Sequence, residues 1–144
     1  MRAVVVREPG GPEAMTVAEL PAPEPAAGEV VVAVEAAGVN PVDLGNRMDA
    51  GWAGLETPYV LGYEFAGTVV GLDGVPTELS IGDPMWGLLP VRGTRWGAYA
   101  ERVAVDASLV ARRPEGFDPV EAACLPLAGG TAVQALDRLG VQEG

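Results

Sequence analysis

Two short polar segments stand out in a chain that is otherwise rich in apolar residues and glycine. The first, AAGVNPVD, places Asn40 and Asp43 directly after a run of valines. The second, LGYEFAG, carries Tyr63 and a single carboxylate, Glu64, among apolar residues and glycines. An amide or a phenol can donate a hydrogen bond to an oxygen that gains negative charge, and a carboxylate can orient backbone amides. Such loops serve either a sharp change of chain direction or a site, and we interpret this pair as a site without a metal.

Several common mechanisms are excluded by residue types that the sequence lacks. The chain has no histidine and one cysteine, Cys124. A Ser-His-Asp or Cys-His arrangement therefore cannot form, nor can a three-histidine zinc centre, a multi-cysteine zinc centre or an intramolecular disulfide. Cys124 is surrounded in sequence by alanines and leucines, which predicts that it is buried as a small apolar residue.

The overall composition indicates one globular domain. The 144 residues are 49% hydrophobic, which is enough for a single core. The formal net charge is −11 and the basic residues form no long run, so we expect no nucleic-acid partner. No apolar run is long enough to span a membrane, and the N-terminus resembles an opening strand more than a secretion signal. We therefore expect a cytoplasmic protein without a membrane partner.

The elements that must position the polar segments are short strands. Twenty glycines and 13 prolines are spread along the chain and separate short apolar runs, as in an all-β barrel or sandwich. We predict a mainly β barrel of about six to eight strands over residues 1–117. The clearest strand covers 29–39, with Val30, Val32, Val34 and Ala36 on one face. Further strands are predicted at 2–6, 15–20, 67–75, 83–89, 97–105 and 109–114.

Helices are predicted at two places. Asn40 is suited to cap a short helical segment within 40–48, with Pro41 at its first position. Residues 118–144 form a helical segment in which Asp118 is the expected N-cap. Gly129 and Gly130 are expected to divide this segment into two helices. The second helix carries an apolar stripe of helical period: Val133, Leu136 and Leu139.

Five motifs occur together in one order along the chain: AAGVNPVD, LGYEFAGTVVGLDG, IGDPMWG, GAYAERVAV and EAACLPLAGGTAVQAL. In this order they resemble the N-terminal catalytic domain of medium-chain dehydrogenase/reductases, in the zinc-free quinone oxidoreductase (zeta-crystallin-like) branch. The resemblance covers essentially residues 1–144. It implies a GroES-like β-barrel, with the C-terminal helices leading toward a Rossmann domain that this sequence does not contain. No G-x-G-x-x-G dinucleotide motif is present.

The resemblance also implies that no metal is bound. Zinc-dependent members carry a cysteine where this chain has Asn40, and a Gly-His-Glu motif where it has Gly62, Tyr63 and Glu64. Zinc in proteins is held by three or four nitrogen, sulfur or carboxylate ligands, and these positions supply only one good ligand. We therefore expect neither a catalytic nor a structural zinc ion.

The family's chemistry assigns roles to some of these residues. Its members transfer a hydride from NADPH to an electron-poor carbon of a quinone or an α,β-unsaturated carbonyl compound. The resemblance implies that the Asn40 amide lies near the nicotinamide and donates to the developing oxyanion, and that Thr131 lies close to the same end of the cofactor. Tyr63, at the position of the lost histidine, is the second catalytic candidate. The alternatives are a helix cap for Asn40 and Thr131 and simple packing for Tyr63.

Supporting roles are expected for the remaining residues. Asp43 is expected to orient the loop by bonding backbone amides. Glu64 requires a partner if it is buried, and we expect a salt bridge with Arg47. Three tryptophans in glycine-flanked segments are candidates for lining the pocket of a planar quinone or enone, or else for ordinary packing: Trp52, Trp86 and Trp96.

Two functions from different classes remain open at this stage. The chain is either the catalytic-domain portion of an NADPH-dependent oxidoreductase, inactive in isolation, or a stand-alone GroES-like module that binds a ligand or protein without chemistry. In the first case the full-length protein is expected to act on a small-molecule quinone or enone and can form a homodimer. The sequence does not distinguish NADPH from NADH by any residue of its own.

Overall fold

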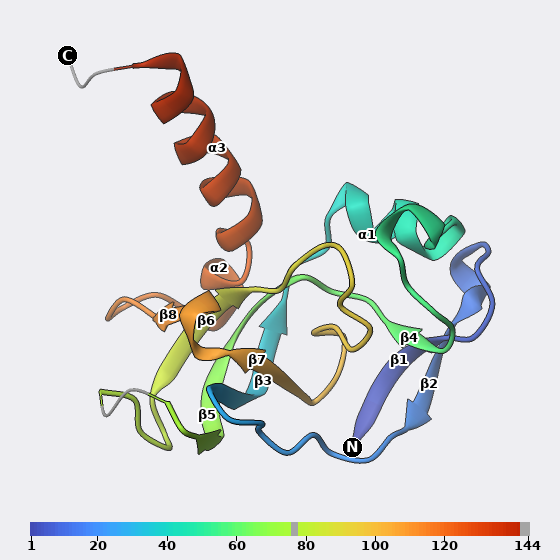
Figure 1. Ribbon diagram of the computed structural model, residues 1–144, viewed down its shortest axis with the longest axis horizontal. Helices are drawn as coiled ribbons and strands as arrows, with labels where there is room; N and C mark the ends of the chain where they lie inside the picture. Colours follow the sequence, from blue (N-terminus) through green and yellow to red (C-terminus); the bar gives the residue numbers. More distant parts are fainter. Residues whose placement is uncertain (76–77, 142–144) are drawn as a thin grey trace.

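The computed structural model describes residues 1–75 and 78–141, and it is mainly β (Figure 1). The strands are β1 (Arg2–Val6), β2 (Met15–Glu19), β3 (Glu29–Ala37), β4 (Tyr59–Val60), β5 (Glu64–Asp73), β6 (Pro84–Leu88), β7 (Arg102–Asp106) and β8 (Val110–Arg112). The helices are α1 (Pro41–Met48), α2 (Pro119–Ala122) and α3 (Pro126–Leu139), with short 3-10 turns at Pro12–Ala14, Gly51–Ala53 and Ala107–Leu109. The predicted class, mainly β with short helices, is confirmed.

The strands form two antiparallel sheets, one of three strands in the order β2-β1-β4 and one of five in the order β7-β3-β5-β6-β8. The long strands β3 and β5 pair at the centre of the larger sheet. Isolated bridges join Ala3 to Ala100 and Val60 to Trp96, so the segment before β7 connects the smaller sheet to the larger one. The first polar segment follows β3 and the second leads into β5, so both lie at the same end of this central pair.

The core lies against the inner face of the larger sheet. Val30 and Val32 pack there with Tyr63 and Phe65, and Val34 adds to the same cluster, as the predicted alternation required. Ala36 departs from the prediction: it packs instead with a separate alanine cluster, because the pairing of β3 with β5 shifts register between Val34 and Ala36. A β-bulge of this kind reverses the faces of the residues beyond it.

The C-terminal helices differ from the prediction in where they divide. The Asp118 side chain accepts from Val120 N at 2.8 Å and caps α2, as expected. The break falls at 123–125, and α3 then continues through Gly129 and Gly130 without interruption. Pro126 explains the difference: proline is well suited to the first helical position, whereas glycine inside a helix costs only about 1 kcal/mol.

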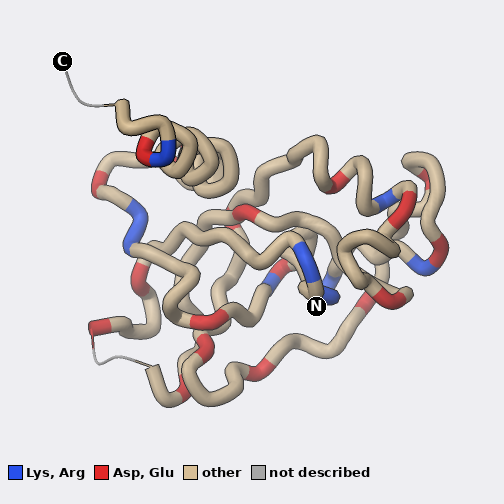
Figure 2. Tube along the Cα trace, turned by 45° about the horizontal axis from the view of Figure 1, so that its top comes forward, with Lys and Arg blue, Asp and Glu red and all other residues tan. Residues whose placement is uncertain are grey.

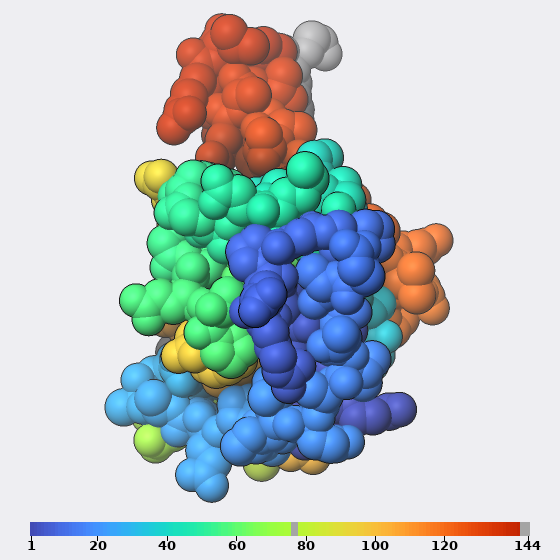
Figure 3. Space-filling model, turned by 90° about the vertical axis from the view of Figure 1, so that its right-hand side faces the viewer, coloured from blue at the N-terminus to red at the C-terminus, as the bar shows by residue number. Residues whose placement is uncertain are grey.

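Helix α3 projects from the body of the molecule (Figures 1 and 3). Every residue from 131 to 141 is exposed, including the predicted apolar stripe of Val133, Leu136 and Leu139. Acidic residues are distributed along most of the chain, with few basic residues among them (Figure 2). Among the described residues, no helix has the length and apolar character needed to cross a membrane.

Candidate active site

Asn40 occupies the turn between β3 and α1. Its backbone is extended, with φ −122° and ψ 157°, and it is the N-cap of α1, followed by Pro41 at the first helical position. Asn40 and Asp43 form a capping box, in which the side chain of each faces the backbone of the other. The Asp43 half is a hydrogen bond of 2.8 Å from Asn40 N to Oδ2. The predicted helix and its cap are therefore present, and they fix the backbone from which the Asn40 side chain extends.

Asp43 connects α1 to the segment that precedes β5. Its carboxylate is 3% exposed, and Oδ1 accepts from Gly62 N at 2.9 Å while Oδ2 accepts from Asn40 N. Burial raises the pKa of Asp43, and the two backbone donors oppose that rise. The neighbouring Tyr99 hydroxyl donates to Gly38 O at 3.2 Å, and burial together with Asp43 raises the pKa of Tyr99. Asp43 thus contacts backbone amides from two segments, which is what an orienting role requires.

Glu64 opens β5 and is 2% exposed. Oε1 accepts from Asn40 Nδ2 at 2.7 Å, and Oε2 accepts from Leu127 N, in the first turn of α3, at 2.8 Å. The predicted salt bridge with Arg47 is wrong. Arg47 lies two turns along α1 from Asn40, and its Nε donates to Gly10 O at 3.2 Å. Two neutral donors therefore satisfy the buried carboxylate in place of a cation.

Tyr63 is fully buried in the core cluster of the larger sheet. Its hydroxyl accepts from Asn46 Nδ2, and burial is the main cause of the raised pKa of Tyr63. The prediction that this phenol donates to a substrate is contradicted, because a side chain with no exposed surface cannot reach one. The packing alternative describes its position.

Asn46 is a polar residue that the sequence analysis did not single out. It is fully buried on α1; its backbone carbonyl accepts from the Tyr59 hydroxyl at 2.8 Å, and its Oδ1 has no hydrogen-bond partner among the described residues. Asn46 follows Asp43 by three residues, so both lie on the inward face of α1. That spacing is the signal by which sequence reasoning could have found it.

The three tryptophans do not share a pocket. Trp52 is 48% exposed beside Arg92, whose guanidinium lies 5.5 Å from the ring centroid. Trp86 lies on β6 and packs against the alanine cluster under α2. Trp96 is 46% exposed beside Arg95, which lies 4.8 Å from its ring. Trp96 and Trp86 line different cavities and Trp52 lines neither of them, so a role of the three rings at a substrate stays a prediction.

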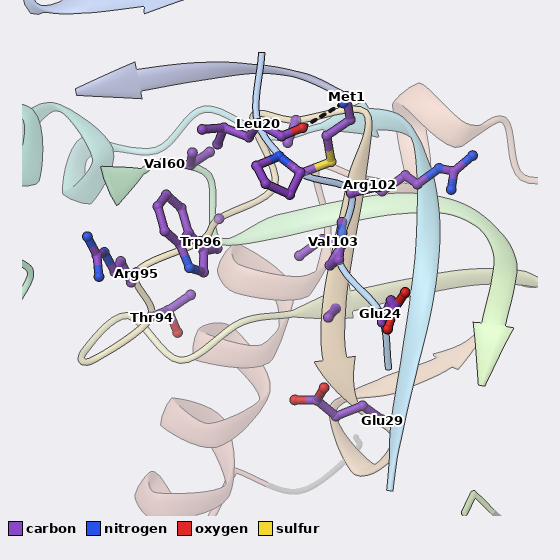
Figure 4. A pocket seen from close by; sticks show the side chains of 16 residues that line it. Met1, Leu20, Glu24, Glu29, Val60, Thr94, Arg95, Trp96, Arg102 and Val103 are labelled. Carbon is purple, nitrogen blue, oxygen red and sulfur yellow. Dashed lines mark hydrogen bonds between the residues drawn. The ribbon is translucent and has the colours of Figure 1, made fainter. Parts of the chain in front are cut away.

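A cavity of about 530 Å³ is lined by residues of both sheets and of the segments that connect them (Figure 4). Its walls are the proline-rich segment 20–24, the loop 94–97 and β7, and Trp96 and Val103 are among the residues that line it. Asn40, Asp43 and Glu64 do not line it. The cavity therefore contributes nothing to the arrangement around Asn40.

Two predictions concern the start of α3. Thr131 is exposed, and its hydroxyl donates to Leu127 O at 2.7 Å inside the helix, so the predicted N-cap role is wrong. Leu127 is also the residue whose N–H bonds Glu64, which places Thr131 one helical turn beyond the Asn40–Glu64 pair.

Cys124 is exposed, contrary to the prediction, because it lies in the short connection between α2 and α3 rather than inside a helix face.

The arrangement does not fit a zinc centre. Among the described residues, no three His, Cys, Asp or Glu side chains lie close enough together to hold a metal ion. At the positions of interest, Asn40 and Glu64 bond each other and Tyr63 is engaged by Asn46. What remains for chemistry is the half-buried Asn40 amide, whose second N–H makes no hydrogen bond within the described part of the chain.

Comparison with known proteins shows the family of the chain. The pattern of the alcohol dehydrogenase GroES-like domain matches residues 26–115, which include α1 and strands β3 to β8. The chain belongs to this family. Its fold is therefore GroES-like, and the resemblance to the catalytic domain of medium-chain dehydrogenase/reductases is confirmed.

Individual relatives of this GroES-like domain are oxidoreductases. It is 33% identical over 144 residues to the chloroplastic NADPH-dependent alkenal/one oxidoreductase of Arabidopsis thaliana, a match covering 96% of this chain and 37% of that protein. The quinone oxidoreductase of Coxiella burnetii matches with a TM-score of 0.89 at 30% identity, covering 100% of this chain and 46% of that chain. The quinone oxidoreductase of Thermus thermophilus, solved also in complex with NADPH, matches with a TM-score of 0.78 at 35% identity. The match covers 100% of this chain and 42% of that chain.

The GroES-like domain is shorter than these relatives. It spans between 28% and 37% of the length of four curated proteins that it matches and less than half of the two solved chains.

Proposed function

We propose that this GroES-like domain is the catalytic-domain portion of a zinc-free, NADPH-dependent oxidoreductase that reduces quinones or α,β-unsaturated carbonyl compounds. The observation that carries the proposal is the Asn40 amide. It is held at the start of α1 by the capping box with Asp43 and by Glu64, and it keeps one N–H without a partner among the described residues. The names of the relatives, which include quinone and alkenal/one oxidoreductases, supply the substrate class.

The chemistry requires a donor at the substrate oxygen. NADPH, when bound, supplies a hydride to the electron-poor carbon. The electron pair of the attacked double bond would then shift toward the carbonyl group, whose oxygen takes up the negative charge, and a proton from water would complete the reduction. A fixed N–H of Asn40 stabilises that oxygen as it becomes negative, and a preorganised donor of this kind contributes about 10²–10³ in rate. The anchoring of Asn40 by two carboxylates keeps the donor in place before the charge develops.

The residues present fit a nicotinamide at one point besides the substrate donor. The Thr131 hydroxyl lies one turn beyond Leu127 on the exposed surface of α3, and because its proton goes to Leu127 O it can accept a hydrogen bond from the carboxamide. No dinucleotide-binding motif occurs in these residues, so we propose that the 144 residues alone do not turn over. The exposed apolar stripe of α3 supports further protein packing there, since a stand-alone binding module is expected to carry polar residues on such a face.

The test begins with the size of the native protein. An immunoblot of the source cells with an antibody to this domain should give a band at roughly twice the length of the chain or more. The protein of that size, purified, should oxidise NADPH when a quinone or an enone is added, and an Asn40→Ala variant should lose about 10²–10³ in kcat. A band at the length of this chain, or no NADPH oxidation by the purified protein, would reject the proposal and favour the binding-module alternative. Undiminished turnover in the variant would instead reject the role assigned to Asn40.

A further inference from the structure

Glu64 hydrogen-bonds both the Asn40 amide and the start of α3. A carboxylate that is 2% exposed is costly unless each oxygen is hydrogen-bonded. Here Oε1 is taken by Asn40 Nδ2 at 2.7 Å and Oε2 by Leu127 N at 2.8 Å. The two partners lie 24 and 63 residues away in sequence. The carboxylate therefore joins two segments that are distant along the chain.

The chemistry of the carboxylate fixes the orientation of the amide. An ionised carboxylate only accepts hydrogen bonds, whereas an asparagine side chain offers nitrogen on one side and oxygen on the other. Glu64 therefore holds the nitrogen of Asn40 and leaves its oxygen facing the backbone of Asp43 in the capping box. With the amide held in this orientation, its second N–H points in a single fixed direction. A glutamine at position 64 can both donate and accept, so it would bond either the nitrogen or the oxygen of the Asn40 side chain and would no longer fix which of them faces it.

The other oxygen of Glu64 serves α3. The first backbone N–H groups of a helix have no partner within the helix, and the N-cap residue usually supplies one from its side chain. The N-cap of α3 is Leu125, whose side chain has no acceptor, and the first position is Pro126, which has no N–H. Glu64 accepts from Leu127 N in place of a local cap. Negative charge at this end also complements the helix dipole.

Gly38 leaves room for the carboxylate. A Cβ built on Gly38 would lie 2.2 Å from Glu64 Oε1, so any side chain at this position displaces the carboxylate from Asn40. Gly38 N also donates to the Glu64 backbone carbonyl at 3.1 Å, which holds the two strands together at this level. An alanine at 38 is therefore a way to move the carboxylate without removing its charge.

We propose that Glu64 is a positioning residue that sets the orientation of the Asn40 amide and couples it to the first turn of α3. It does not touch the substrate; it determines which atom of Asn40 faces the substrate. The inference rests on the proposed function for the reaction that Glu64 serves. The two hydrogen bonds of Glu64, to Asn40 and to Leu127, belong to the 144-residue chain and can be measured without a cofactor.

The direct test is NMR on the isotope-labelled chain. In the wild type, scalar couplings across hydrogen bonds should join Asn40 Nδ2 and Leu127 N to the Glu64 carboxylate carbon. In Gly38→Ala, the Asn40 side-chain protons and the Leu127 amide proton should both exchange with solvent about tenfold faster or more, the factor expected for the loss of a hydrogen bond to an ionised group. In Glu64→Gln, at least one of these two sites should exchange faster, because glutamine has a single acceptor oxygen. The matched control is Glu35→Gln, which removes an exposed carboxylate of β3 that accepts from Thr68.

The NMR results distinguish the two parts of the proposal, the orientation of Asn40 and the coupling to α3. Absence of both couplings in the wild type overturns the proposal, even where the variants fail to fold. Unchanged exchange at Asn40 in Gly38→Ala rejects the positioning role, and unchanged exchange at Leu127 in Gly38→Ala rejects the coupling to α3. Unchanged exchange at both sites in Glu64→Gln rejects both parts. In the native-length protein, Glu64→Gln should lower kcat about tenfold and leave the KM for NADPH unchanged. No turnover in the wild type would reject the proposed function while leaving the NMR result intact.

Discussion

Gly62 is the position at which a single methyl group should disturb the site most. Its φ is +92°, a conformation that side chains rarely adopt, and its N–H donates to Asp43. A Cβ at this position would lie 2.5 Å from Cδ1 and 2.8 Å from the backbone N of Tyr99. The Tyr99 ring can turn, but its backbone cannot move away, because Tyr99 N donates to Leu61 O at 2.9 Å and Ala98 N donates to Gly62 O at 2.8 Å.

The cost of Gly62→Ala has two parts. The positive φ costs about 1–2 kcal/mol for an L-residue. Crowding in a closely packed site adds about 1–3 kcal/mol. We therefore expect the free energy of unfolding to fall by about 2–5 kcal/mol, a large part of the stability of a domain of this size. Urea unfolding of the chain, followed by tryptophan fluorescence, measures this difference.

Two other glycines separate the contributions. Gly54 has φ +67° with nothing near its Cβ position, so Gly54→Ala should cost only the conformational part, about 1–2 kcal/mol. Gly45 lies inside α1, also with open space around it, and Gly45→Ala should raise the stability by about 0.5–1 kcal/mol. Equal losses for Gly62→Ala and Gly54→Ala would show that Tyr99 does not crowd position 62 and would refute the reasoning.

Three further predictions concern neighbouring residues. Tyr63→Phe should lower the free energy of unfolding by about 1–2 kcal/mol, because it leaves the buried Asn46 amide without a partner; if the phenol donated to substrate instead, turnover of the native-length protein would also fall. Cys124 is exposed, so a maleimide should label the folded chain as fast as it labels the urea-unfolded one, and strong protection would contradict its placement. Burial raises the pKa of Asp43 above its ordinary 3.8, so the native state binds the proton more tightly than the unfolded state. The free energy of unfolding of the wild type, measured against Asp43→Asn, should therefore fall as pH rises from about 4 through that raised pKa, and a rise would reverse the assigned cause.

Local signals in the sequence predicted most of the elements. Asn40 and Pro41 fixed the start of α1, and the valine run fixed β3, because caps and alternation act within a few residues. The strand β5 begins at Glu64 rather than at 67, since Glu64 pairs with Leu88 of β6, a partner that local pattern does not reveal. The short strand β4 was missed for the same reason: it exists through its pairing with β1.

The candidate site was predicted in its residues and only partly in its contacts. The sequence showed that Glu64, among apolar neighbours, needs a partner if it is buried. It did not show which one, because Asn40 and Leu127 reach it only through the folded sheet. Arg47 was chosen for its charge, although its place on α1 directs it toward Gly10. Tyr63 was assigned by its chemical type, and its burial depends on the packing of the complete core.

The two carboxylates described above also constrain how the domain folds. Asp43 bonds the backbone of Gly62, 19 residues from itself, and Glu64 bonds groups 24 and 63 residues from itself. Contacts of such separation form late and slow the folding of β proteins, because the intervening loops must close first. A partly folded form in which β3 and β5 have not yet paired does not hold the Asn40 amide in place. A small molecule that binds this amide and not the unfolded chain will therefore raise the thermal stability of the domain according to its affinity and concentration.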